Sequence, residues 1–395
     1  MNFAFQPEIE MAKETAEKIH KKFEGRRKEL FEKIRRNEFV QEIWDELAKA
    51  GFLGSIVPHE YGGTGIGLLG SAVAMEELAK YGIGNALFVL TICAESCIIR
   101  NGSEQIKRKF LPAMAEGKIK CALGVTEPEA GTNTFRIKTF AEKKNGRYII
   151  NGEKTYITGA DVADYILLVT RTIPYSELSK KGLPKMYGLS LFMVDLKSKG
   201  IKMHKLNTRG IEGMNQFTIF FEDVEVPEEN LVGEENQGVF VMFNGLNPER
   251  ILAGASAVGL SEFCLKRAVE YANQRCVFGE RPIGSYQAIQ HPLADVKIRQ
   301  EAVRLVVYKS AWAYDNNLPP QEVMFLANSA KYLAAELLLQ AVDRAIQTYG
   351  GAGFVEDNFF IILWDSARLL KTAPISNEMI LNLTAEHVLG LPRSY

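Results

Sequence analysis

Hydrophobic periodicity changes twice along this chain of 395 residues. Apolar residues fall at helical spacing through residues 1–120, whereas residues 121–235 contain short β-rich runs separated by Asn, Gly and Pro. From residue 236 onward long stretches with helical spacing return. Apolar residues recur about every 3.6 residues in an α-helix and every 2 residues in a β-strand, so the chain cannot consist of one kind of element throughout. The sequence therefore predicts an α+β protein with an N-terminal all-α domain (1–120), a middle β-domain (121–235) and a C-terminal helical bundle domain (236–395).

Element boundaries are marked by capping residues and turn residues. Ser103 precedes a segment that we expect to be helical and to end near Gly117. The expected strands include residues 148–150, 165–169, 189–194 and 217–221. The expected long helices are residues 237–274, 286–315, 320–349 and 376–389. Four long helices with short connections predict a bundle.

Composition narrows the functional classes. The chain has 47 basic and 48 acidic residues and a formal net charge of -1, which gives no basic field for nucleic acid. No apolar run reaches the length of a membrane span. Cys93 and Cys97 are one helical turn apart and could in principle share a metal, but no second ligand pair accompanies them. We therefore expect buried thiols, no metal, and a reducing cytoplasmic location.

Two adjacent segments carry the strongest chemical signal. The first is Gly-Val-Thr-Glu-Pro-Glu-Ala-Gly-Thr-Asn at 124–133, and the second is Tyr-Ile-Ile-Asn-Gly-Glu-Lys-Thr-Tyr-Ile-Thr-Gly at 148–159. Their glycines and threonines would let backbone amides and hydroxyls approach a flat polar ring closely. Propensity alone leaves the first segment as a surface loop between two strands.

Further motifs follow in a fixed order. Those at 61–65, 221–227, 230–233, 275–279, 287–290 and 347–354 combine glycine turns, acidic runs and single cationic or aromatic residues. With the two segments above, the ordered set resembles acyl-CoA dehydrogenases over nearly the whole chain. The resemblance implies an N-terminal helical domain, a middle β-barrel domain and a C-terminal four-helix bundle. It also implies FAD as cofactor, an acyl-CoA substrate, an electron-transfer flavoprotein as electron acceptor, and a homotetramer or homodimer.

The resemblance assigns the flavin-ring contacts to the middle domain. Thr126 and Thr158 would hydrogen-bond the ring, and Tyr156 stands where the family usually has Trp against its face. Thr132 replaces the usual Ser and keeps a hydroxyl, while Asn133 replaces the usual Asp and lacks its charge. The remaining cofactor residues implied here are Val125 and Gly131. Each Thr taken alone would be a β-edge residue with its hydroxyl in water.

A second group of cofactor residues lies in the C-terminal domain. Arg275 has the fixed charge that suits a pyrophosphate, and Phe278 can pack on an adenine. In the family, a neighbouring subunit supplies part of these groups to each dinucleotide site, and the resemblance therefore implies an obligate homo-oligomer. The others implied are Gln287, Gln347, Gly350, Gly351, Ser376 and Glu378. The glycines at 63, 65 and 67 lie between helical segments rather than after a strand, so we do not expect NAD.

The catalytic base departs from the family's usual place. Removing a proton beside a thioester carbonyl needs a carboxylate whose pKa burial can raise. Most members carry it in a Tyr-Glu-Gly-Thr segment, but here that stretch reads Thr-Ala-Pro-Ile-Ser-Asn-Glu-Met at 372–379. Anchoring on Asn377 and Glu378 puts Pro374 in its place, and a one-residue slip puts Ala373 there.

A second location exists in the isovaleryl and long-chain branches, directly before an Arg. This chain has Asn247-Pro248-Glu249-Arg250 there. We expect Glu249 to be the base, and Asn247, Arg250 and Thr132 to contact the substrate, with Arg250 helping to bind coenzyme A. Glu249 could instead be a first-turn helix residue favoured by the dipole, and Glu95 is the reserve candidate.

Pro374 raises a second question about the carbonyl. The family polarises the thioester oxygen partly with the backbone amide at the usual Glu position, and proline has no amide hydrogen. The predicted function is FAD-dependent dehydrogenation of an acyl-CoA to the enoyl-CoA. The alternatives are an enoyl-CoA reductase or oxidase on the same scaffold, and a non-catalytic acyl-CoA-binding flavoprotein.

Overall fold

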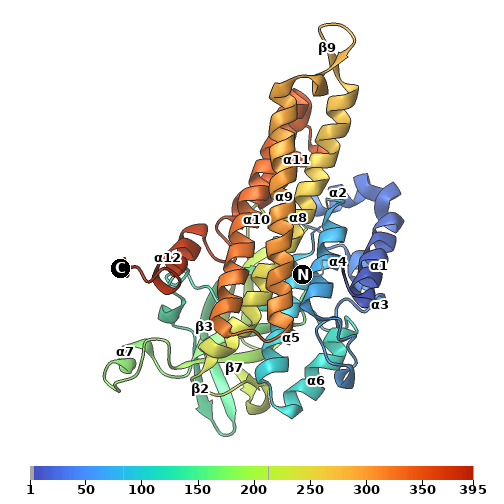
Figure 1. The fold of residues 1–395 in the computed structure, drawn as a ribbon. Helices are drawn as coiled ribbons and strands as arrows, with labels where there is room; N and C mark the ends of the chain where they lie inside the picture. Colours follow the sequence, from blue (N-terminus) through green and yellow to red (C-terminus); the bar gives the residue numbers. More distant parts are fainter. Residues whose placement is uncertain (1–3, 83, 212, 395) are drawn as a thin grey trace.

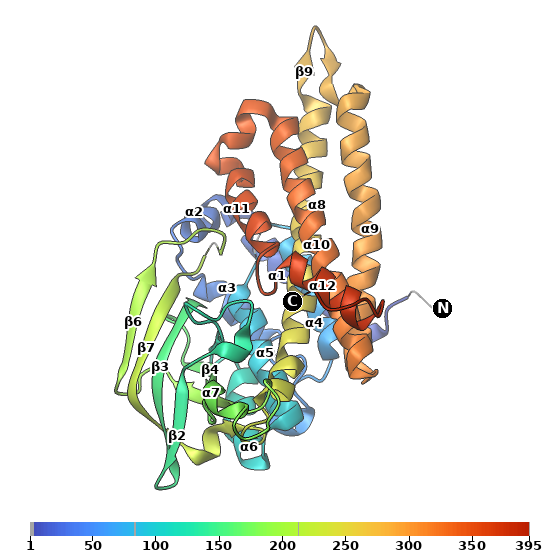
Figure 2. The same cartoon turned by 90° about the vertical axis from the view of Figure 1, so that its left-hand side faces the viewer.

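The computed structural model describes residues 4–82, 84–211 and 213–394. Long C-terminal α-helices form a bundle, with a β-sheet against one end of it and a group of shorter helices along its side (Figures 1 and 2). The helix–sheet–helix order predicted from periodicity is confirmed. Within the described ranges, no helix is long and apolar enough to cross a membrane.

The N-terminal helices are capped as their sequences direct. Ser103 Oγ accepts a hydrogen bond from the Ile106 amide, and Asn85 does the same for Phe88. α5 is buried almost all round, so it forms the centre of the molecule rather than one of its faces. The α-helices of this region are α1 (Pro7–Phe23), α2 (Arg27–Arg35), α3 (Gln41–Lys49), α4 (Gly67–Ala79), α5 (Ala86–Asn101) and α6 (Glu104–Ala115).

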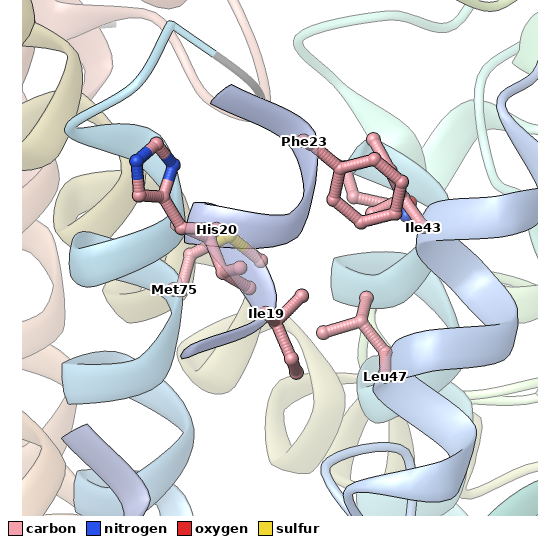
Figure 3. Close-up of a pocket in the computed structure, with 8 residues that line it drawn as sticks. Ile19, His20, Phe23, Ile43, Leu47 and Met75 are labelled. Carbon is pink, nitrogen blue, oxygen red and sulfur yellow. The ribbon is translucent and has the colours of Figure 1, made fainter. Parts of the chain in front are cut away.

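A small apolar cavity lies within this region, among α1, α3 and α4. Ile19, His20 and Phe23 of α1 line it together with Leu47 and Met75, as Figure 3 shows. Burial lowers the pKa of His20 to about 3, and the charges of Arg27 and Lys266 add to this, so the imidazole is neutral. None of the predicted cofactor, substrate or catalytic residues lines this cavity.

The middle region is one mixed sheet with strand order β6-β7-β3-β2-β4-β5-β8, and β1 pairs in parallel with β4. This pairing is an open path from β6 to β8, so closure into a barrel stays a prediction. Its strands are β1 (Cys121–Gly124), β2 (Phe140–Lys144), β3 (Arg147–Thr158), β4 (Tyr165–Arg171), β5 (Leu189–Asp195), β6 (Ile201–Leu206), β7 (Gln216–Pro227) and β8 (Leu231–Val232). A short helix, α7 (Tyr175–Leu178), lies between β4 and β5.

The C-terminal bundle is built on α8, a helix of 37 residues. Two further long helices run beside it, and Pro320 starts α10 because its fixed φ suits a first helical position. A hairpin of β9 (Cys276–Val277) and β10 (Arg281–Pro282) joins α8 to α9 at the end farthest from the sheet (Figure 1). The helices are α8 (Gly238–Gln274), α9 (Gln287–Asp315), α10 (Pro320–Tyr349), α11 (Phe360–Leu370) and α12 (Asn377–His387).

Glycine brings α8 into contact with α5. A methyl group added at Gly245 would lie 2.7 Å from the sulfur atoms of both Cys93 and Cys97, so only glycine allows this approach. Both thiols are buried, as are those of Cys121 and Cys264, whereas Cys276 is exposed on the β9 hairpin. The buried-thiol prediction is confirmed for four of the five cysteines.

Candidate active site

The segment that follows β1 is fixed from behind by a buried ion pair. Lys154 of β3 is fully buried, and its Nζ lies 2.8 Å from the carbonyl oxygen of Val125 and 2.8 Å from Oε1 of Glu127. The Thr155 amide donates to the Thr126 carbonyl oxygen at 2.9 Å. The backbone predicted to meet the flavin ring is therefore held in place by the protein itself.

Lys154 was not among the site residues predicted from the sequence, although it lies within the motif at 148–159. Burial lowers the pKa of its amine to about 8, against the opposing effect of the Glu127 carboxylate. A lysine on a strand that otherwise places apolar side chains inward was the available signal.

Tyr156 lies at an irregularity in the β3–β7 pairing. The register shifts between Lys154 and Ile157, and Tyr156 has a φ of 58°. Positive φ is uncommon for a bulky residue, and residues held in such a conformation cluster at functional sites. The bulge turns this ring outward, so that 60 % of Tyr156 is exposed. An aromatic plane is thus presented at the position where the resemblance expects one.

The nearby hydroxyls and glycines leave room for a ligand. The Thr158 hydroxyl accepts a hydrogen bond from Gln216 at 3.3 Å, which leaves its own hydrogen free to donate. Thr132 is exposed, and a Cβ built at Gly131 would meet nothing within 4 Å. These residues fit a flat polar ring system.

Six of the eight residues in the second group of predicted cofactor residues lie at the opposite end of the bundle, whereas Ser376 and Glu378 lie at the start of α12. Arg275 ends α8 and Phe278 is at the hairpin tip, 98 % exposed. Stacking of Tyr271 on Tyr349 brings the ends of α8 and α10 together, which places Gln347 here too. Gly350 and Gly351 follow α10, and a Cβ on either would meet nothing within 4 Å. Gln287 is exposed at the start of α9.

One chain does not bring these two groups together. Arg275 directly follows α8 and Glu249 lies within it, so a rise of 1.5 Å per residue separates these two residues by about 40 Å. Figure 1 shows the β9 hairpin and the sheet at opposite ends of the bundle. The separation agrees with the expectation that a neighbouring subunit supplies part of the dinucleotide site.

Glu249 lies well inside α8, one turn after Gly245. α8 begins at Gly238, so the alternative reading of Glu249 as a first-turn residue after Pro248 is wrong. Oε2 of Glu249 is buried without a hydrogen-bond partner among the described residues. Burial raises the pKa of the carboxyl to about 7, and the charge of Arg250 only partly offsets this. Such a carboxylate is poised to take up a proton near neutral pH.

Arg250 is more deeply buried than a coenzyme-binding surface residue would be. Only 4 % of it is exposed. Its Nη1 donates to Oδ1 of Asn247 at 3.2 Å, whereas its Nε is buried with no partner among the described residues. Burial lowers the pKa of Arg250 to about 10, with Glu249 acting in the opposite direction, so the guanidinium remains charged at neutral pH.

The segment at the family's usual base position is held by Lys331 of α10. This buried amine donates to the carbonyl oxygen of Ile375 at 2.6 Å and to Oδ1 of Asn377 at 2.8 Å. Ser376 caps α12 by accepting from the Met379 amide, and Glu378 is exposed. The Ala373–Pro374 peptide bond is cis. Lys331 was missed from the sequence because only the fold brings it to this segment.

Glu95, the reserve candidate, is fully buried in α5 with neither carboxyl oxygen hydrogen-bonded among the described residues. Burial raises the pKa of this carboxyl well above its usual value. Thr91, one turn earlier, accepts a hydrogen bond from the Cys121 amide of β1, so this face of α5 meets the sheet. Cys93 and Cys97 instead face α8, where Glu249 lies. Glu95 and Glu249 therefore do not form one site.

Comparison with known families decides the assignment. Three family models match in order: acyl-CoA dehydrogenase N-terminal domain over residues 6–118, middle domain over 122–224 and C-terminal domain over 236–389. The chain belongs to the acyl-CoA dehydrogenase family. The resemblance to this family and the α+β fold with its N-terminal, middle and C-terminal domains are confirmed, whereas the placement of the catalytic Glu and the closure of the barrel stay predictions.

Individual relatives agree. The chain is 40 % identical over 365 residues to acyl-CoA dehydrogenase fadE12 of Mycobacterium tuberculosis, covering 92 % of each chain. It is 33 % identical to mitochondrial isovaleryl-CoA dehydrogenase of Pongo abelii, covering 82 % of this chain and 75 % of the relative. The structure of butyryl-CoA dehydrogenase from Megasphaera elsdenii superposes with a TM-score of 0.90 at 30 % identity, covering 98 % of this chain and 100 % of the other. The chain is an acyl-CoA dehydrogenase-type oxidoreductase.

Proposed function

We propose that this protein removes two hydrogens from the α and β carbons of an acyl-CoA thioester, with Glu249 as the base and FAD as the hydride acceptor. Glu249 carries this proposal, since its partner-free oxygen and a pKa of about 7 are the properties a proton acceptor needs. Bound FAD would supply the two-electron chemistry. This chain's residues would hold the flavin ring, orient the thioester and take the α-proton.

Support for FAD comes from the residues themselves. Lys154 fixes the Val125 carbonyl, the β3 bulge presents the Tyr156 ring, and Thr158 keeps a hydroxyl hydrogen to donate. A solved relative at 25 % identity and TM-score 0.88 carries the name "FAD complex of PigA". An electron-transfer flavoprotein is the proposed electron acceptor, in keeping with a neighbour whose description names an electron transferring flavoprotein.

A reductase role is the second candidate, because two relatives are named for reduction. They are the caffeyl-CoA reductase-Etf complex subunit CarC of Acetobacterium woodii and the 3-(aryl)acrylate reductase of Clostridium sporogenes, at 33 % and 32 % identity. The same base would then return its proton to the α carbon. Physiological direction depends on the electron partner rather than on Glu249.

The test follows the visible flavin spectrum anaerobically while straight, branched, cyclic and aromatic acyl-CoAs are titrated. Bleaching by a saturated acyl-CoA supports dehydrogenation and identifies the acyl class. Reoxidation of chemically reduced flavin by an enoyl-CoA, without bleaching by any saturated partner, would support reduction. A yellow protein that responds to neither class would overturn both and favour the non-catalytic binder.

A further inference from the structure

Proton removal beside a thioester places negative charge on the carbonyl oxygen, so a donor must meet that oxygen. In the register anchored on Asn377 and Glu378, the residue at the usual donor position is Pro374, which has no amide hydrogen. Lys331 fixes the segment that follows through the Ile375 carbonyl and the Asn377 side chain, and the Asn377 amide donates to the Lys371 carbonyl oxygen. A donor from another element can take the place of the missing amide hydrogen.

Arg250 has an unused donor in the right region. Nε of Arg250 is buried without a partner, although Nη1 is used by Asn247. A buried, charged donor without an acceptor is costly, since desolvation of the group is not repaid. The unpaired Nε–H of Arg250 therefore suggests that a ligand supplies its acceptor.

Packing brings the part of α8 that follows Arg250 against the part of α10 that holds residues 375–377. A methyl group added at Gly254, one turn further along α8, would lie 3.5 Å from the carbonyl oxygen of Ala330 in α10. The next residue of α10 is Lys331, which holds Ile375. Burial lowers the pKa of Lys331 to about 8, and the positive charge of Arg250 is the second cause.

We propose that the Arg250 guanidinium meets the thioester carbonyl oxygen and stabilises its negative charge, replacing the amide hydrogen that Pro374 lacks. Arg250 is then a catalytic residue adjacent to the base. The Glu249 carboxylate takes the α-proton, and the electron pair of that C–H bond forms the enolate. Bound FAD would be the two-electron oxidant: it would accept the hydride from the β carbon, and the enolate pair would then form the α,β double bond. This inference rests on the proposed function.

Depth distinguishes this role from binding of coenzyme A phosphates. At 4 % exposure, Arg250 lies in the interior beside Glu249, whereas phosphate groups need a solvent-facing cation. A planar guanidinium also keeps its charge when desolvated, which an amine does less well. The burial thus favours the reacting end of the substrate.

The test uses isotope-edited infrared spectroscopy of the holoenzyme with a carbonyl-labelled enoyl-CoA bound. This product is already oxidised, so it cannot reduce the flavin. In the wild type the carbonyl stretch should fall relative to free ligand. Arg250→Met should remove most of this shift and slow single-turnover flavin reduction about 10²–10³-fold, the usual cost of one such donor. Arg250→Lys should keep part of the shift.

Two further variants separate catalysis from structure. Pro374→Gly adds an amide hydrogen, so in the Arg250→Met background it should restore part of the carbonyl shift. Arg267→Met removes another arginine of α8, one that donates to Asn358 and packs on Phe263, and should leave the shift unchanged.

Several results would overturn the proposal. They are an unshifted carbonyl in the wild type, or a shift that survives in folded, FAD-loaded Arg250→Met. If that variant does not fold, a neutral Arg250→Gln enzyme with a wild-type shift and rate would also overturn it. Failure of every acyl-CoA to bleach the wild-type flavin would instead contradict the proposed function.

Discussion

Nζ of Lys154 lies 2.8 Å from Oε1 of Glu127, and both side chains are buried between β3 and the loop after β1. Removing one member of such a pair leaves a buried charge uncompensated, which costs about 3–5 kcal/mol. Because Lys154 also holds the Val125 carbonyl, the flavin-facing loop should loosen as well. We expect Lys154→Met to lower Tm by several degrees and to lose FAD during gel filtration.

Lys202→Met provides the matched control for that experiment. Nζ of Lys202 lies 2.8 Å from Oε2 of Glu222, the same separation, but both side chains are more than half exposed. Exposed pairs contribute little because water screens them. Equal effects of the two substitutions on Tm and on FAD retention would contradict a special role for Lys154.

Replacing the base should separate cofactor binding from chemistry. Glu249→Gln keeps the shape of the side chain but cannot accept the α-proton, so flavin bleaching should slow about 10³-fold, within the usual contribution of a general base. FAD content and ligand affinity should stay close to wild type. Stopped-flow reduction measures the rate. Glu95→Gln is the comparison, and a larger loss in that variant would move the base to α5.

The pH dependence of flavin reduction should report Glu249. Its pKa is raised to about 7 by burial, and only the ionised form is a base, so the rate should rise with pH and level off above about 7. The Glu249→Gln enzyme should show a flat profile for its residual rate. An inflection close to 4.5, or one retained in Glu249→Gln, would exclude Glu249 as the titrating group.

Folding stability should also depend on the ionisation of Glu249, but it should fall with rising pH, whereas the rate of flavin reduction rises. The folded-state pKa of Glu249 lies above the unfolded value of 4.5, so the folded protein binds the proton more tightly between about pH 4.5 and 7. Stability from this group is present below pH 4.5 and is lost as pH rises through 7. We expect the Tm of Glu249→Gln relative to wild type to increase across this window. A constant difference would contradict the raised pKa.

Much of the fold was predictable because local signals agreed with it. The four expected long helices correspond to α8, α9, α10 and α12, and the Ser103 cap is formed as expected. Within the main sheet, β2, β6 and β8 were not among the expected strands. β2 ends in three charged residues, β6 mixes lysine and histidine with apolar residues, and β8 has two residues, so none gives a strong strand pattern. α11 was missed because its apolar run lies close behind the glycine turn at 350–353.

Only the site residues that lie within recognisable motifs could be predicted from the sequence. The sequence indicated Glu249 and Arg250 through their resemblance to one branch of the family. The depth of Arg250, its free Nε and the contact of Lys331 with Ile375 depend on how α8 and α10 pack, which no local pattern encodes. Periodicity specifies a buried face but not which polar atom on that face lacks a partner.

The β9 hairpin should mediate assembly. Phe278 is 98 % exposed at its tip and has a φ of 50°, so an aromatic ring is held out in water in a strained conformation. Exposed aromatic anchors of this kind are typical of interfaces. We expect Phe278→Glu to shift the protein to a smaller assembly in light scattering and to reduce FAD retention, because Arg275 and Gln347 would no longer reach a neighbouring flavin site.

Met11→Glu is the control for added surface charge, since Met11 is 63 % exposed on α1, away from the hairpin. This substitution should change neither assembly size nor FAD content. Loss of FAD in Phe278→Glu with the assembly intact would restrict Phe278 to a direct contact with the dinucleotide. An unchanged assembly with FAD fully retained would contradict both roles, and the two ends of the bundle would then have to serve separate sites.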